Sequence, residues 1–170
     1  MPVLRQLEQL YDEHGQALFA FLLNLTRNEA DTRDLLQDLF VKLAREPRLL
    51  EHVQNERAFL MRLAFNAAID QKRRAATRQK HDEALAQEFC SVFEASQNPD
   101  EEVLREALSG ALSEIPEEQR AVLHLKLWEG MTFEAIAELI EISTNTAASR
   151  YRYGLDKLRQ RLRPLYDEIK

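Results

Sequence analysis

Short polar side chains and arginines are concentrated between residues 143 and 152. Asn145 can hydrogen-bond bidentately to an adenine edge, and Arg152 to guanine or to a phosphate. Arg150 suits a phosphate contact or a structural bridge to an acid. This pattern is typical of a helix face that enters a DNA groove, and the alternative is an ordinary solvated helix face. The candidate positions are Ser143, Thr144, Asn145, Thr146, Ala148, Ser149, Arg150 and Arg152.

The elements that must position this face have the spacing of a helix-turn-helix. Thr132 can cap a short helix, and Ser143 can cap a longer one. The small side chains of Ala137 and Ala147 would let the two helices approach closely. The turn position that Gly usually occupies is Glu141, which would cost about 1 kcal/mol in a left-handed conformation. An ordinary helical hairpin with a polar turn is the alternative.

Apolar residues recur at three-to-four-residue spacing along most of the chain, which predicts an all-α fold of two small helical domains. Helices over about 3–25 and 28–45, and a third from Glu56 into a basic run, predict a three-helix bundle. A further helix begins near Val103, and another follows Pro116. We expect Tyr11, Leu104, Val122, Leu123, Leu125 or Leu127, and Trp128 among the inward positions.

Charge is distributed unevenly along the chain, whose net charge is −6. Residues 1–80 carry +2, residues 81–107 carry −7 and residues 108–170 carry −1. Affinity for nucleic acid depends on neutralising phosphates with Lys and Arg. We therefore expect the free protein to bind duplex DNA weakly and to read it when another molecule delivers it.

Several classes of function are disfavoured by what the chain contains. Cys90 is the single cysteine, and the four histidines lack the paired spacing of a zinc site, so we expect neither a metal nor a cofactor. Phosphate-binding glycine loops and nucleophile motifs are absent from the sequence, so we expect no enzyme. Neither a membrane-spanning run nor a signal peptide is found, so we expect a cytoplasmic protein.

Two separate motif sets resemble one family, the extracytoplasmic-function sigma factors of bacterial RNA polymerase. The stretch ALSEIPEEQRAVLHLKLWEGMTFEAIAELIEISTNTAASRYRYGLDKLRQRL is similar to sigma region four. The stretches DTRDLLQDLFVKLAR and RAFLMRLAFNAAIDQKRRAATR are similar to region two. The resemblance implies a region-two domain over 1–80, an acidic linker over 81–102 and a region-four domain over 103–170.

The resemblance also implies a role for each cluster. One face, which comprises Asp34, Leu35, Gln37, Asp38 and Phe40, would dock on the clamp helices of the largest polymerase subunit. The polymerase flap would be a second contact of the protein. Another face would bind the −10 element and open the strands, and it comprises Phe65, Asn66, Asp70, Lys72, Arg73 and Arg74. The helix-turn-helix would read the −35 element, and an anti-sigma factor is a further candidate partner.

Two other functions remain open at the level of sequence. A helix-turn-helix regulator that acts without polymerase would leave the first domain as an effector or dimerisation module. A sigma mimic that only titrates an anti-sigma factor would need no basic side chains facing DNA. The presence of Arg150, Arg152 and the basic run 72–74 argues against this function.

Overall fold

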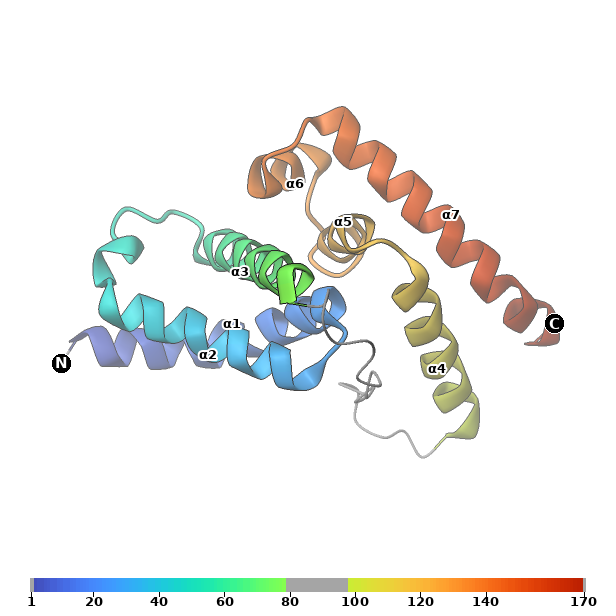
Figure 1. Ribbon diagram of the computed structural model, residues 1–170, viewed down its shortest axis with the longest axis horizontal. Coiled ribbons are helices and arrows are strands. Elements are labelled where there is room, and N and C mark those ends of the chain that lie inside the picture. Colours follow the sequence, from blue (N-terminus) through green and yellow to red (C-terminus); the bar gives the residue numbers. More distant parts are fainter. Residues whose placement is uncertain (1, 79–97, 170) are drawn as a thin grey trace. The chain divides into compact units, whose positions relative to one another are not determined.

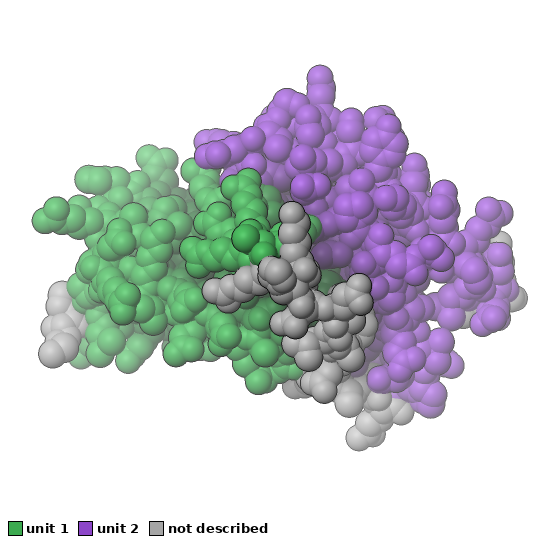
Figure 2. Space-filling view, in the orientation of Figure 1, with its two compact units in different colours: residues 1–90 green, residues 91–170 purple. Residues whose placement is uncertain are grey.

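All secondary structure in residues 2–78 and 98–169, the part of the chain that the computed structural model describes, is helical. The chain divides into two compact units, residues 1–90 and 91–170, which Figure 2 colours separately. The helices, labelled in Figure 1, are α1 (Pro2–Thr26), α2 (Glu29–Arg45), the short 3-10 helix η1 (Pro47–Leu50), α3 (Glu56–Arg78), α4 (Pro99–Glu114), α5 (Glu117–Leu127), α6 (Phe133–Ile140) and α7 (Thr144–Ile169). The predicted all-α fold is confirmed. None of the helices in these ranges is long and apolar enough to cross a membrane.

The first unit is the predicted three-helix bundle, in which α1, α2 and α3 each contact the other two. Leucines at three-to-four-residue spacing turn one side of each helix inward, and burial of such side chains stabilises the fold by about 1.5–3 kcal/mol each. The fully or almost fully buried side chains include Leu18, Phe21 and Leu22 of α1, Leu39 and Leu43 of α2, and Leu60, Met61 and Ala64 of α3.

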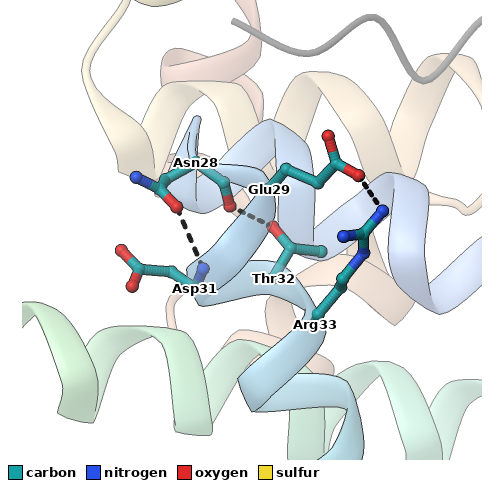
Figure 3. A network of polar contacts seen from close by, with 5 residues as sticks. All are labelled: Asn28, Glu29, Asp31, Thr32 and Arg33. Atoms are coloured by element: carbon teal, nitrogen blue, oxygen red, sulfur yellow. Dashed lines mark hydrogen bonds and ion pairs between the residues drawn. The ribbon is translucent and has the colours of Figure 1, made fainter. Parts of the chain in front are cut away.

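A polar network closes the turn between α1 and α2 (Figure 3). The Asn28 side chain caps α2, because its Oδ1 accepts a hydrogen bond from the Asp31 N–H at 3.0 Å. The buried Thr32 hydroxyl donates to the Asn28 carbonyl at 2.7 Å. Glu29 and Arg33 form an ion pair one turn apart on the exposed side. The Asn28 cap therefore fixes where α2 begins.

In the second unit, α7 packs against α4, α5 and α6. Ala111, Leu112, Ile115, Leu123 and Leu158 form the buried cluster that joins α4, α5 and α7. Arg120 lies almost completely buried beside this cluster, and its guanidinium donates to the Ile115 carbonyl at 2.7 Å. That bond satisfies a carbonyl just beyond the end of α4, where no helical partner is available.

Several sequence expectations for helix ends and burial are corrected. Helix α4 begins at Pro99, inside the predicted linker, because Asn98 caps it and the acids of its first turn favour a helix N-terminus. Residues 79–97, which hold the rest of that linker, lie outside the described residues. The predicted helices leave residues 46–55 unassigned, and η1 occupies the first part of this stretch.

Three apolar side chains expected to face inward are instead exposed. Tyr11 is 53% exposed, Leu104 47% and Trp128 46%. Leu104 lies beyond the buried cluster, whose packing on α4 begins at Leu108. Trp128 follows the last residue of α5 and stacks on the His124 ring, with 5.3 Å between the ring centroids. Of the two alternatives on α5, Leu125 is buried and Leu127 is exposed.

Gly154 allows α7 to approach α5 closely, and a stability measurement can test this. A Cβ atom at Gly154 would lie 2.9 Å from Leu123 Cδ1 and 3.3 Å from Gln119 Cβ, whereas one at Gly110 would meet nothing within 4 Å. Both glycines are helical, so the gain in helix propensity on substitution with Ala cancels between them. We expect the free energy of unfolding of Gly154→Ala to be about 1–3 kcal/mol below that of Gly110→Ala in denaturant titrations. Equal stability of the two variants would contradict the close approach.

Candidate nucleic-acid interface

The first helix of the predicted helix-turn-helix is α6, and its start is set by Thr132. The Thr132 Oγ1 accepts a hydrogen bond from the Ala135 N–H at 3.1 Å, which confirms the predicted cap. Helix α6 then buries one side, formed by Ile136, Ala137, Leu139 and Ile140. With eight residues it is too short to be stable alone, so its position depends on packing against its neighbours.

The turn between α6 and α7 has a left-handed residue followed by a cap. Glu141 adopts φ 58° and ψ 51°, and its N–H donates to the Ala137 carbonyl. Ser143 caps α7, because its Oγ accepts from the Thr146 N–H at 3.0 Å. The Ser143 and Thr146 hydroxyl oxygens lie 2.8 Å apart. Ser143 and Thr146, two of the predicted DNA-contacting residues, thus also form the cap at the start of α7.

Close packing fixes the angle between α6 and α7. Ala147 is completely buried and Ala137 is 6% exposed, as expected for small residues at the crossing of the two helices. Phe133 of α6 meets Tyr151 of α7 edge to face, with 5.4 Å between the ring centroids. The Lys126 Nζ lies 4.5 Å from the centroid of the Phe133 ring. This contact was not predicted, and its signal in the sequence is one aromatic residue on each helix, Phe133 at the first position of α6 and Tyr151 two turns into α7.

The exposed face of α7 carries part of the predicted DNA-contacting set. Thr144, Asn145 and Arg152 are exposed, while Ala148, Ser149 and Arg150 are half-buried. The guanidinium of Arg152 lies 5.8 Å from the centroid of the Tyr153 ring, which is itself exposed. The N-terminal half of α7 therefore presents hydrogen-bonding groups outward from a helix that is capped and packed.

In the first unit, α2 presents an acidic face beside an apolar groove. Asp34, Gln37 and Asp38 are exposed, as the sequence predicted. Leu35 is only 6% exposed and belongs to the core, so its placement on a docking face is corrected. Phe40 is half-buried and packs edge to face on Tyr11 of α1. A groove of about 560 Å³ runs beside this face, lined by Tyr11, Phe19, Arg33, Leu36, Gln37, Phe40, Val41 and Ala44.

The second face of the first unit lies on α3. Asn66, Asp70, Lys72, Arg73 and Arg74 are all exposed. Asn66, Asp70 and Arg73 are three or four residues apart, so they share one side of the helix. Phe65 is 9% exposed, which corrects its placement on this face. Its neighbour Asn66 is exposed, because successive residues on a helix point about 100° apart.

One further polar group lies in the first unit. Ligand atoms of Glu13, His14 and Glu56 lie within 4.8 Å of one another, and in the described residues this is the group whose geometry could hold a metal ion. Glu13 is well exposed, and exposed carboxylates commonly gather around a His without any ion. Sequence spacing could not show the group, because Glu56 comes from the start of α3 and the other two residues from α1.

Comparison with known proteins places both units in one family. The family model "Sigma-70 region 2" matches residues 10–78, and "Sigma-70, region 4" matches residues 111–160. The RNA polymerase sigma factor CarQ of Myxococcus xanthus is 34% identical over 164 residues, covering 95% of this chain and 92% of the relative. The ECF RNA polymerase sigma factor SigX of Bacillus subtilis is 28% identical, covering 94% and 85%. The chain belongs to the extracytoplasmic-function family of RNA polymerase sigma factors.

A solved structure shows the same fold. The sigma factor RpoE, solved in complex with the anti-sigma factor NepR from Bartonella quintana, superposes with a TM-score of 0.77 at 21% identity. The match covers 94% of this chain and 98% of that one. Membership of the sigma-factor family, shown by the two family models and by the curated relatives, means that the protein binds core RNA polymerase and promoter DNA and directs the polymerase to specific promoters.

The turn of the helix-turn-helix in this sigma factor carries conformational strain that can be measured. A left-handed non-glycine residue costs about 1–2 kcal/mol, and the φ of Glu141 is 58°. We expect Glu141→Gly to raise the free energy of unfolding by about 1 kcal/mol in thermal or denaturant unfolding. Glu141→Ala removes the same charge but keeps a Cβ atom, so it should recover little of this gain. Equal stabilisation by Gly and Ala would show that charge, and not backbone conformation, is the cause.

Proposed function

We propose that the exposed face of α7 reads the −35 element, that of α3 binds the −10 element and that of α2 binds core polymerase. The observation that carries the proposal is the presentation of Asn145 and Arg152 on one side of a capped and tightly packed α7. The proposal assigns a region-two domain to residues 1–80, a linker to 81–102 whose last four residues form the first turn of α4, and a region-four domain to 103–170. It assigns no catalytic residue, and it places the protein in the cytoplasm, where its polymerase acts.

In this proposal the N-terminal half of α7 reads the −35 element. Asn145 and Arg152 are seven residues apart, which is two helical turns and about 10 Å along the axis. That length matches about three base pairs, so the two side chains can reach different positions in one major groove. Ala148 and Ser149 lie between them, and Thr144 directly precedes Asn145. The half-buried Arg150 contacts a phosphate or braces a neighbouring helix. Ser143 and Thr146 act through the cap.

The α3 face engages the −10 element. Lys72, Arg73 and Arg74 are exposed, and cationic side chains of this kind bind the backbone of a displaced single strand. Asn66 and Asp70 continue the same side of the helix with hydrogen-bonding groups. Phe65 is buried, so it supports this face from the core and does not stack on a base.

The α2 face binds core polymerase at the clamp helices, and the region-four domain contacts the flap. Asp34 and Asp38 provide charge, and Gln37 and Phe40 continue the face into the groove beside α1. Leu35 supports this face from the core. Because RpoE, which shares the fold, was solved with the anti-sigma factor NepR, we also propose an anti-sigma factor as a partner that competes with polymerase.

Separate variants distinguish polymerase binding from strand opening. We expect reversal of charge at Asp34 and Asp38, each to Lys, to abolish association with core polymerase in a pull-down while the helical content is unchanged. Replacing Arg73 and Arg74 with Ala should leave association intact but impair opening, measured by permanganate reactivity of the −10 region. Charge reversal at Glu8 and Asp12, which are exposed acids on α1, is the matched control. It should affect neither association with core polymerase nor strand opening. If both pairs affected association equally, the assigned division between α2 and α3 would be wrong.

Base preference tests the α7 face. Asn145→Ala and Arg152→Ala should each weaken promoter use by about 1–3 kcal/mol if the contact is bidentate, and each should relax preference at one −35 position only. Transcription from a promoter library randomised at −35 gives both quantities. Lys157→Ala is a suitable control, because Lys157 is exposed on another side of α7. Unchanged preference in both test variants would mean that the reading face is misassigned.

A further inference from the structure

Glu141 occupies a position that is unfavourable for a glutamate in two independent ways. Its backbone is left-handed, which a residue with a Cβ atom adopts only at a cost. Its carboxylate is also at the C-terminus of α6, where the helix dipole disfavours negative charge and where α6 has no basic residue in its last turn. Glycine would remove both costs. A residue that strains its own fold in this way suggests a role outside folding.

The Glu141 side chain has no partner within the described part of the chain that would explain it. It is exposed, and among residues 2–78 and 98–169 its carboxylate takes part in no hydrogen bond or ion pair. The charge therefore remains directed to solvent, two residues before the Ser143 cap of α7. Whatever approaches the start of α7 meets this carboxylate.

The start of α7 would otherwise attract phosphate. Free N–H groups and the helix dipole make a helix N-terminus favourable for anions, and Thr144 and Asn145 add exposed donors there. A carboxylate within one Debye length, about 8–10 Å at ordinary salt, opposes that attraction. Its effect acts on every phosphate backbone irrespective of sequence, because it makes no base contact.

We propose that Glu141 is an electrostatic attenuator of DNA binding, which weakens sequence-independent binding of duplex DNA by the sigma factor outside the holoenzyme. This inference rests on the proposed reading of DNA by α7. With Glu141 in place, the contacts of α7 alone are too weak to hold the free protein on random DNA. Binding then requires the additional contacts that core polymerase supplies, so the region-four unit reaches the −35 element mainly when polymerase delivers it.

The test is a titration of the full-length free protein against a mixed-sequence DNA duplex, followed by fluorescence anisotropy at low and high salt. We expect Glu141→Gln, which keeps the side-chain size and the Cβ atom, to bind about two- to fivefold more tightly at ~0.05 M salt. The gain should disappear towards ~1 M salt, where the Debye length is about 3 Å. Glu141→Gly should tighten binding to the same degree, because the charge and not the backbone is the cause.

Asp167→Asn provides the matched control. It also removes one exposed acid from the chain, but Asp167 lies about 35 Å along α7 from Thr144, far beyond the Debye length. It should leave affinity unchanged. If Asp167→Asn tightened binding as much as Glu141→Gln, a general effect of net charge would replace the proposal.

Arg152→Ala in the same titration separates this inference from the proposed function. If Arg152→Ala weakens binding while Glu141→Gln changes nothing, the attenuator role is wrong and the α7 face is still supported. If neither variant changes binding, the assignment of α7 to DNA fails and the inference fails with it. Weaker binding by Glu141→Gln would show that the carboxylate makes a favourable contact, and a gain seen only with Glu141→Gly would assign the effect to backbone conformation. Each of these last two results would overturn the proposal.

Discussion

Close packing of α7 against its neighbours is the constraint on which the DNA-facing surface depends. Ala147 lies completely buried where α7 meets α6, and Gly154 lets the same helix approach Leu123 of α5 within van der Waals distance. Since α6 is only eight residues long, it cannot hold α7 at an angle by its own stability. Ala147 and Gly154 are seven residues apart and share one side of α7, so these small residues let α6 and α5 pack closely against that side. This packing sets the direction in which the exposed polar face points.

The caps complement this packing by defining where each helix begins. Side chains of Asn28, Thr132 and Ser143 accept hydrogen bonds from backbone N–H groups that would otherwise lack a partner. At the start of α7 the cap also determines which residues form the first exposed turn. A shift of one residue would rotate that turn by about 100° and remove Asn145 from the outward face. The proposed reading of bases by α7 therefore depends on the Ser143 hydroxyl as well as on packing.

The electrostatic attraction between this sigma factor and DNA is limited by its net charge and by the distribution of its basic residues over two units. The net charge is −6, and the cations on α3 and α7 belong to two different compact units. We expect neither unit to bind DNA strongly by itself, because each neutralised phosphate adds only one increment of affinity. On that expectation, polymerase brings several weak contacts together. The proposed role of Glu141 has the same effect, because its carboxylate would weaken DNA binding by the free protein.

The sequence by itself determined most of the helices, the caps at Thr132 and Ser143, the helix-turn-helix and the family, because these depend on local spacing and on motifs that occur in order along the chain. The left-handed conformation at Glu141 was also predictable, since the turn length leaves that residue little choice. The sequence misplaced the start of α4, although Asn98, Pro99 and the following acids are local signals, because their acidity resembled a linker. Only the tertiary structure decided which apolar and polar side chains each surface presents. Leu35 and Phe65 are buried, Leu104 and Trp128 are exposed, and Glu56 joins Glu13 and His14. Periodicity indicates that a helix has an apolar side, but the extent of burial depends on where the neighbouring helix ends, and that neighbour is distant in sequence.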